Sequence, residues 1–497
     1  MFDLILQGAP LLFTMQTMLL IAAGIVGGLV IGVLPGLGPL MGIVLLLPVA
    51  FHLPPIPAMG MLIAVYIGGS AGGSISAILL RIPGTPLAAA TLFDGYPMAQ
   101  KGRSQDAIGL SITASALGGL IGGVMLVFFS PMLAAFALRF GPPEYAAMAL
   151  LGLTTIIVVS EGSAIKGLLT GGLGLLIATI GTDEFTNAYR YTFGNFNLTS
   201  GPNIVAVVVG LFAISEFLFQ IGGGGFLDTP RLQKLVISFR ALRLIASHKV
   251  NLVRSALIGT GLGAIPGAGG DVSAFVSYAV ARKFSKPEDG YGEGAEGGVV
   301  ATEAANNGCC GGALIPSLSL GIPGDASTAV LLAALFLLGF FPGPELFRSN
   351  ADVAGGIFLA YLTGNVILLI LGIVLVPFFG TVLKLKKAWL LPIVLLLSTM
   401  GTYALQNSVF DLYVMLVFGG LGFLLRRAGY PLAPIIIGII LGPVLENNFR
   451  RSLLLSRDGP MIFVERPISA TILTVVAIML CYIVYTLVRS GRQDTAS

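Results

Sequence analysis

Polar residues that could bind an ion lie inside otherwise apolar stretches of this sequence. Asp271, Asn306, Asn307 and Asp325 supply carboxylate and amide oxygens, which suit a hard cation such as sodium, whereas a carboxylate alone suits a proton. A charge at mid-bilayer costs roughly 2.5–3.5 kcal/mol on insertion scales, so these four residues are predicted to serve cation coupling. Glu303 shares one helical face with Asn306 and Asn307, at i, i+3 and i+4. The alternative is that these residues cap half-helices or face the cytoplasm.

Motifs rich in glycine and proline form the second candidate site. GVLPGLGP at 32–39 recurs as GAIPGAGG at 263–270, and IPGT at 82–85 has its counterpart in IPGD at 322–325. Glycine lets the backbone approach a ligand, proline ends an incoming half-helix, and the free N–H groups of the next helix attract anions. The predicted substrate-binding residues are Pro35, Gly36, Gly38, Gly84, Thr85, Pro266, Gly267, Gly269, Gly324, Ser327 and Thr328. The alternative is a plain helix kink or structural turn.

Residues for enzyme chemistry are scarce. The sequence has two histidines, no CxxC pair and no GxxxxGK[ST] loop. Cys309 and Cys310 are adjacent in an apolar stretch, where cysteine serves as a small packing residue. We therefore expect no catalytic residue, no metal site and no cofactor, with Na⁺ or H⁺ as the coupling ion. A membrane-embedded enzyme is the least favoured class.

The composition indicates where these residues must lie. Of 497 residues, 56% are apolar and 10% are charged, whereas a soluble domain carries about 25% charged residues. This excludes an ordinary soluble enzyme, a disordered chain and a nucleic-acid-binding protein, and it predicts an all-α polytopic membrane protein in a lipid bilayer. Many apolar segments are shorter than the roughly 20 residues of a full span. The 68 glycines and 28 prolines therefore predict broken helices.

An internal repeat organises the chain. The order of motifs at 32–39 and 68–84 returns at 263–270 and 307–324. The distribution of Lys and Arg around these motifs alternates between the halves, which predicts two inverted-topology repeats. Arg450, Arg451, Arg457 and Arg466 are at odds with this pattern, because they would lie outside. The predicted parts are a first transmembrane repeat at 1–222, a basic cytoplasmic linker at 223–250, a second inverted repeat at 251–447, and a loop plus C-terminal transmembrane helix at 448–497.

If both flanks of a Gly-Pro motif lie on one side of the membrane, the segment enters and returns. Residues 17–51 and 252–281 would then be re-entrant hairpins whose tips meet at mid-membrane from opposite faces. Inverted-repeat transporters hold anions and coupling ions at such tips. A polar block at 282–298 is predicted to be a flexible cytoplasmic loop.

Three long strings resemble the large membrane subunit of the tripartite tricarboxylate transporters. They are YIGGSAGGSISAILLRIPGTPLAAATLFDGYPMAQKG, GAIPGAGGDVSAFVSYAVARKFSK and EAANNGCCGGALIPSLSLGIPGDASTAVLLAALFLLGFFPGP, and the likeness runs from about residue 20 to 450. It implies a multi-pass protein of the bacterial inner membrane that imports a tricarboxylate or related carboxylate by symport, driven by a sodium or proton gradient. It also implies two partners, a small four-helix membrane subunit and a periplasmic solute-binding protein.

The sequence departs from the usual family pattern within the two Gly-Pro breaks. Arg81 stands near a usual Asn, and Asp325 stands where a small residue is common. These departures put citrate in doubt as the substrate, but not transport. The competing hypothesis is a gradient-independent channel or facilitator for small anions, which re-entrant hairpins would also fit.

Overall fold

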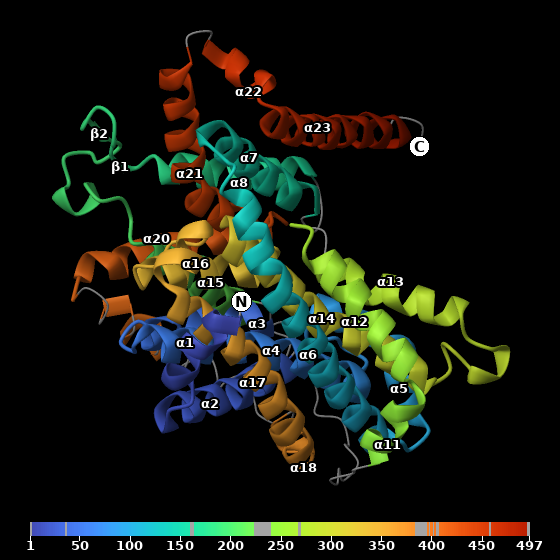
Figure 1. Ribbon diagram of the computed structural model, residues 1–497. Coiled ribbons are helices and arrows are strands. Elements are labelled where there is room, and N and C mark those ends of the chain that lie inside the picture. Colours follow the sequence, from blue (N-terminus) through green and yellow to red (C-terminus); the bar gives the residue numbers. More distant parts are fainter. Residues whose placement is uncertain are drawn as a thin grey trace.

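The chain is built almost entirely of helices (Figure 1). The computed structural model describes residues 2–34, 37–159, 164–222, 240–266, 270–382, 395–396, 398–400, 402–403, 407–456 and 459–494. In these residues the extended structure is one antiparallel pair, β1 (Gly181–Thr182) and β2 (Tyr189–Arg190). The prediction of an all-α protein is confirmed.

The helices of the first half are α1 (Phe2–Leu12), α2 (Met15–Val33), α3 (Gly38–Ala50), α4 (Pro55–Leu80), η1 (Pro86–Phe93), α5 (Gly95–Gln100), α6 (Ser104–Ala137), α7 (Pro142–Val159), α8 (Ala164–Ala178), η2 (Phe196–Leu198), α9 (Ile204–Val209), η3 (Gly210–Ile214) and α10 (Ser215–Gly222). Those that follow are α11 (Arg240–Ser247), α12 (Lys249–Gly263), α13 (Gly270–Lys283), η4 (Pro287–Asp289), α14 (Glu296–Leu320), α15 (Ala326–Leu337), α16 (Pro344–Ser349), α17 (Ala351–Val374), α18 (Val376–Val382), α20 (Val409–Arg427), α21 (Ala433–Leu455), η5 (Gly459–Met461), α22 (Ile462–Glu465) and α23 (Pro467–Asp494).

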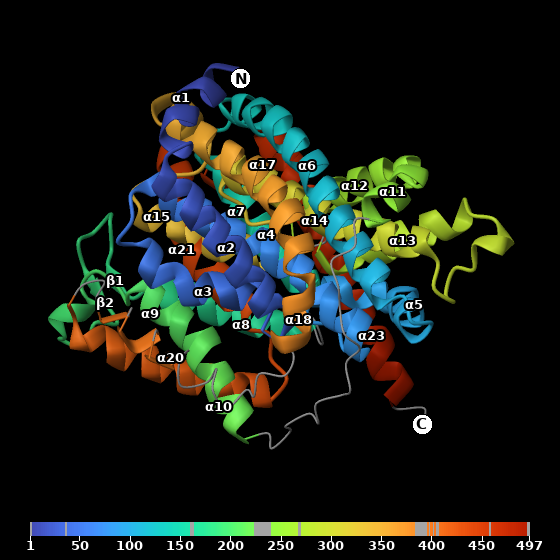
Figure 2. The same ribbon diagram turned by 90° about the horizontal axis from the view of Figure 1, so that it is seen from below.

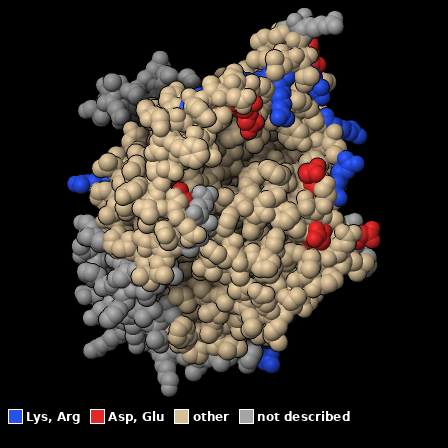
Figure 3. Space-filling view, turned by 90° about the vertical axis from the view of Figure 1, so that its left-hand side faces the viewer, with Lys and Arg blue, Asp and Glu red and all other residues tan. Residues whose placement is uncertain are grey.

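Five of the described helices are long and apolar enough to cross a membrane: α2, α4, α6, α17 and α20. A sixth span is added if the pair on either side of residue 466, bent by 91°, counts as one. Shorter apolar helices such as α3 and α15 leave backbone groups at their ends that must find partners inside the protein. Figure 3 shows a largely uncharged face, with most of its charged side chains in the upper and right-hand part. The chain is a multi-pass membrane protein with broken helices.

Glycines bring the first helix of each hairpin against the long helix that follows. On α2, a Cβ added at Gly28 would lie 2.6 Å from the Val65 carbonyl oxygen of α4. On α12, a Cβ added at Gly259 would lie 2.2 Å from the Ala305 oxygen of α14. Small residues permit this close approach of helix backbones in lipid. The duplicated sequence therefore produces the same packing twice.

The long helices α6 and α17, each the third helix after a Gly-Pro break, run in opposite directions. Their facing positions are Ile112 with Gly372, Gly119 with Asn365, and Gly123 with Tyr361, so one number rises while the other falls. Figures 1 and 2 show both helices beside α4 and α14.

The central helices α4 and α14 also run in opposite directions. Helix α6 is parallel to α14, since Gly118 faces Ala304 and Gly122 faces Gly308. Helix α17 is parallel to α4, since Gly356 faces Ile56 and Gly364 faces Ile67. These two pairs of helices are therefore antiparallel, as an inverted repeat would place them. The inverted repeat itself and the sidedness of the halves stay predictions.

Ion pairs fasten the loop after α8 to the end of α21. Arg450 contacts Asp183 at 2.7 Å and Glu446 at 3.1 Å, and Arg190 contacts Glu446 at 2.7 Å. The Arg450 guanidinium and two backbone N–H groups hold the pKa of the Asp183 carboxyl well below its usual range. Helix α21 continues to Leu455, so the segment predicted to be a loop from residue 448 begins as helix. Two of the arginines that were at odds with the charge pattern, Arg450 and Arg466, thus have acidic partners, the latter through Glu144 at 2.6 Å.

The glycine contact between α2 and α4 can be tested with two neighbouring residues. Replacing Gly28 by alanine forces the α2 and α4 backbones apart, and we expect it to destabilise the protein by about 1–3 kcal/mol. Gly27 has open space at its Cβ position, so Gly27→Ala is the matched control. The measurement is thermal unfolding of the detergent-purified protein. Equal melting temperatures for the two variants would contradict the packing described for this helix pair.

Candidate functional site

Helices α2 and α3 form the first predicted hairpin. Gly42 of α3 faces Ile31 of α2, and Pro39 packs on Gly69 near the midpoint of the long helix α4. The hairpin tip therefore lies halfway along a membrane-spanning helix. Gly38, which begins α3, has φ +60°, a conformation that glycine adopts without strain. The tip residues Pro35 and Gly36 lie outside the described residues.

The first Gly-Pro break returns to this tip. Helix α4 ends at Leu80, and the chain then turns back, so that the Gly84 N–H donates to the Gly73 carbonyl at 3.0 Å. Thr85 caps η1 by accepting from the Ala88 N–H at 3.3 Å. Its methyl group is the nearest atom to a Cβ built at Gly38, at 3.6 Å. The structure thus brings together three predicted substrate-binding residues, Gly38, Gly84 and Thr85.

The second half repeats this arrangement. Gly263, at the end of α12, packs on Cys309 near the midpoint of α14, and Pro266 lies in the turn that follows. Gly267 and Gly269 lie outside the described residues. Asp271 lies in the first turn of α13, and its side chain is likewise outside them.

The break after α14 closes in the same way as the first. Gly321 ends the helix with φ +71°, and Gly324 packs on Ala313. Asp325 then caps α15, with its Oδ1 accepting from the Thr328 N–H at 2.7 Å and from the Thr328 hydroxyl at 2.9 Å. Ser327 follows in the first turn and is buried. The side chain of Asp325, predicted to serve cation coupling, is thus also a helix cap.

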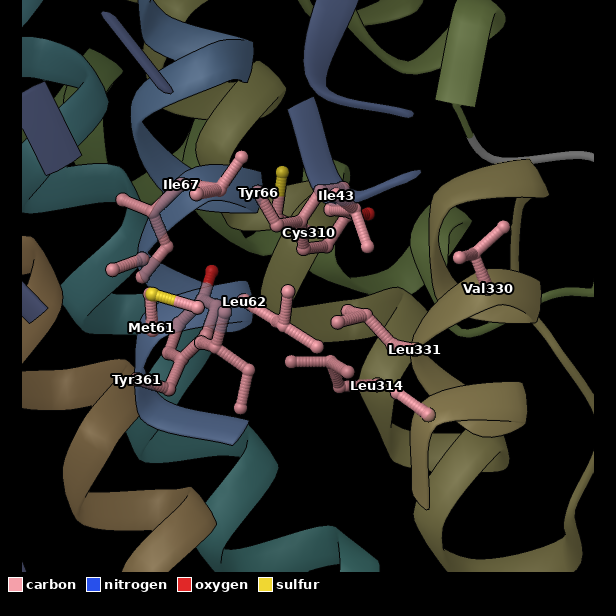
Figure 4. Close-up of a cluster of buried hydrophobic side chains, with 14 of the residues drawn as sticks. Ile43, Met61, Leu62, Tyr66, Ile67, Cys310, Leu314, Val330, Leu331 and Tyr361 are labelled. Carbon is pink, nitrogen blue, oxygen red and sulfur yellow. The ribbon is translucent and has the colours of Figure 1, made fainter. Parts of the chain in front are cut away.

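Each short helix after a break packs on the opposite half. Tyr66 of α4 donates its hydroxyl to Asp325 Oδ2 at 2.5 Å. Phe93 of η1 lies with its ring centroid 5.1 Å from that of Tyr278 on α13. Figure 4 shows the apolar cluster around the first contact, which includes Met61, Leu62, Tyr66 and Ile67 of α4, Cys310 and Leu314 of α14, Val330 and Leu331 of α15, and Tyr361 of α17. The two halves therefore interlock at their breaks.

Asp94, directly after η1, fixes this short helix to the second half. Its Oδ1 accepts from the backbone N–H groups of Gly292, Gly294 and Ala295, each at 2.8 Å. The polar block at 282–298 was predicted to be a flexible loop, but three hydrogen bonds hold its end on η1. Arg81 lies away from these contacts, with its guanidinium 5.6 Å from the centre of the Tyr96 ring.

Asn306 and Asn307 lie fully buried where α14 crosses α4. Their amide groups donate to the carbonyls of Ser70 at 3.1 Å and Ile67 at 3.4 Å. Their Oδ1 atoms have no hydrogen-bond partner within the described part of the chain. Two unused acceptors in a buried place are unusual and suit a cation or a proton donor. The role of the two asparagines in coupling stays a prediction.

Glu303 was singled out in the sequence but was not among the predicted coupling residues. It is fully buried one turn before Asn306. The Thr91 hydroxyl of η1 donates to its Oε1, and the Ser115 hydroxyl of α6 donates to its Oε2 at 2.9 Å. Its i, i+3, i+4 spacing with Asn306 and Asn307 was the signal that pointed to it.

Paired hairpins and broken helices in a multi-pass helical protein are typical of membrane transport proteins. The tripartite tricarboxylate transporter TctA family matches residues 18–437. The chain is 37% identical over 454 residues to an Agrobacterium vitis protein described as an uncharacterized 52.8 kDa protein in the TAR-I ttuC' 3' region, covering 91% of this chain and 90% of that protein. It is 35% identical over 236 residues to a protein in the TAR-II ttuC' 3' region of the same organism, covering 48% of this chain and 98% of the relative.

The chain belongs to the tripartite tricarboxylate transporter TctA family, whose members are membrane components of transporters. This confirms the family resemblance seen in the three sequence strings.

Two substitutions separate the capping role of Asp325 from a role of its charge. Asp325→Asn keeps an oxygen that can accept from the Thr328 N–H, so we expect near-native stability. Asp325→Ala removes the cap and should cost about 0.5–2 kcal/mol. Thermal unfolding of both purified variants decides the point. If asparagine destabilises as much as alanine, the charge and not the cap stabilises this end of α15.

Proposed function

We propose that this chain is the large membrane subunit of a binding-protein-dependent secondary transporter. It imports a tricarboxylate or a related carboxylate, driven by a sodium or proton gradient. The supporting observation is the pair of hairpins whose first helices, α2 and α12, pack at Gly32 and Gly263 near the midpoints of the antiparallel helices α4 and α14. Inverted-repeat transporters bind substrates between such elements.

The substrate's carboxylates would bind at the start of the helices that follow the tips and breaks. Helix N-termini carry free N–H groups and a partial positive charge, which favour anions. The glycines at these positions leave room for the backbone to approach the ligand. Two sites of opposite orientation would let the substrate be reached from either side of the membrane in turn.

The family membership suggests the remaining parts of the system. A small four-helix membrane subunit would accompany this chain in the bacterial inner membrane. A periplasmic solute-binding protein would deliver the substrate to the outer face.

Uptake by the reconstituted protein tests this proposal. Proteoliposomes would contain this chain with its small subunit, and the binding protein would be supplied outside. Labelled carboxylates would be offered with a sodium gradient, a pH gradient or neither. We expect gradient-dependent accumulation above the outside concentration. Flux that only equilibrates, with or without the binding protein, would replace the proposal by the gradient-independent facilitator.

A single substitution tests the first tip. Gly38 has φ +60°, and alanine there strains the backbone by about 1–2 kcal/mol although its Cβ has room. We expect Gly38→Ala to reduce uptake while the protein still inserts in the membrane, because the strained backbone shifts the first turn of α3. Gly27→Ala on the same hairpin is the control. Uptake equal to that of the unmodified chain would argue against a substrate site at this tip.

A further inference from the structure

The carboxyl group of Glu303 lies in a pocket made of hydroxyl groups from both halves. Thr91 of η1 donates to Oε1, and Ser115 of α6 donates to Oε2 at 2.9 Å. The Thr91 hydroxyl is also 3.0 Å from that of Thr302. Glu303 itself is fully buried, as are these three residues.

No basic side chain balances this carboxyl group among the described contacts. The titratable or charged groups on the elements packed around it have other partners: Asp94 with backbone N–H groups, Asp106 with Arg103 and Arg240, Arg254 with Asn251, and Arg81 with the Tyr96 ring. Arg282 and Lys283 lie in the last turn of α13, beyond Tyr278. A buried carboxylate without a counter-charge is strongly disfavoured, so the group needs a proton or a bound cation.

The contacts favour the proton. Glu303 is the one carboxylate among these contacts, and its partners are neutral hydroxyl groups. A single carboxylate with such partners suits a proton. The proton needs an acceptor, and the unpartnered Oδ1 of Asn306 lies one turn further along the same face of α14.

We propose that Glu303 is the proton-binding residue that couples transport to a pH gradient. This inference rests on the proposed function and names its coupling ion. A proton from water on the entry side binds one carboxyl oxygen, and it returns to water on the other side when the substrate has been released. No bond other than O–H forms or breaks, and nothing is oxidised or reduced.

The position of Glu303 connects proton binding to the first break. Ionised Glu303 accepts from Thr91 and Ser115, whereas the protonated group also donates and so changes its bonding with η1. Thr91 belongs to the helix that Thr85 caps, beside Gly38 at the hairpin tip. Protonation of Glu303 would therefore shift η1 and, with it, the first break, which ends at Thr85, six residues before Thr91.

Transport under separate gradients tests the assignment. The complete complex in proteoliposomes would receive a pH gradient without sodium, or a sodium gradient at constant pH. We expect the unmodified chain to accumulate substrate with the pH gradient alone. Glu303→Gln, which imitates the protonated group, should lose this accumulation by roughly tenfold or more. Glu345→Gln makes the same change at an exposed carboxylate and should behave like the unmodified chain.

The outcomes separate the two proposals. Accumulation with the sodium gradient alone, or normal pH-driven accumulation by Glu303→Gln, would overturn the role of Glu303 and leave secondary transport standing. Accumulation with neither gradient would overturn secondary transport itself.

A direct measurement applies in every case. The infrared spectrum of the purified chain should contain a protonated-carboxyl band that titrates with pH and is absent in a monodisperse Glu303→Gln sample. Ser115→Ala should shift this band without removing it. An identical spectrum for Glu303→Gln would refute proton binding at Glu303.

Discussion

Direct contact between helix backbones at glycine residues sets the geometry on which the rest of this structure depends. Lipid offers no hydrophobic force between apolar helices, so close packing of small residues must hold them together. At Gly32 and Gly263, the equivalent residues of the repeat, even one added methyl group would meet a backbone oxygen, of Gly69 at 2.2 Å and of Cys309 at 2.4 Å. These contacts place the ends of α2 and α12 near the midpoints of α4 and α14.

The same close packing allows the chain to return on itself at the Gly-Pro breaks. Gly84 reaches Gly73 and Gly324 reaches Ala313 because there is no side chain on either glycine to prevent it. The short helices that follow cross into the opposite half, so neither half can change its break without affecting the other. Asp94 reinforces this connection by binding three N–H groups of the second half.

The duplicated scaffold carries polar groups that are not duplicated. By the glycine contacts that the two halves share, Glu303 corresponds to Ile63 in the first half, and Asp325 corresponds to Thr85. The two halves therefore have similar backbones but different side chains. The second half supplies both of these carboxyl groups: Glu303, which contacts η1 after the first break, and Asp325, which follows the second break. Similar halves with different polar residues suit a transporter, which binds its ligand at one site and opens that site to each side of the membrane in turn.

The sequence by itself determined the membrane class, the broken helices and the duplication. Apolar composition, glycine and proline spacing, and motif order are local properties, and they predicted the two breaks at Gly84 and Gly324. Only the tertiary structure decided which polar groups meet. Thr91 and Glu303 are far apart in the chain, and their contact depends on how η1 crosses onto α14. Asp325 likewise reads as a free charge in sequence, but folding gives it Thr328 and Tyr66 as partners.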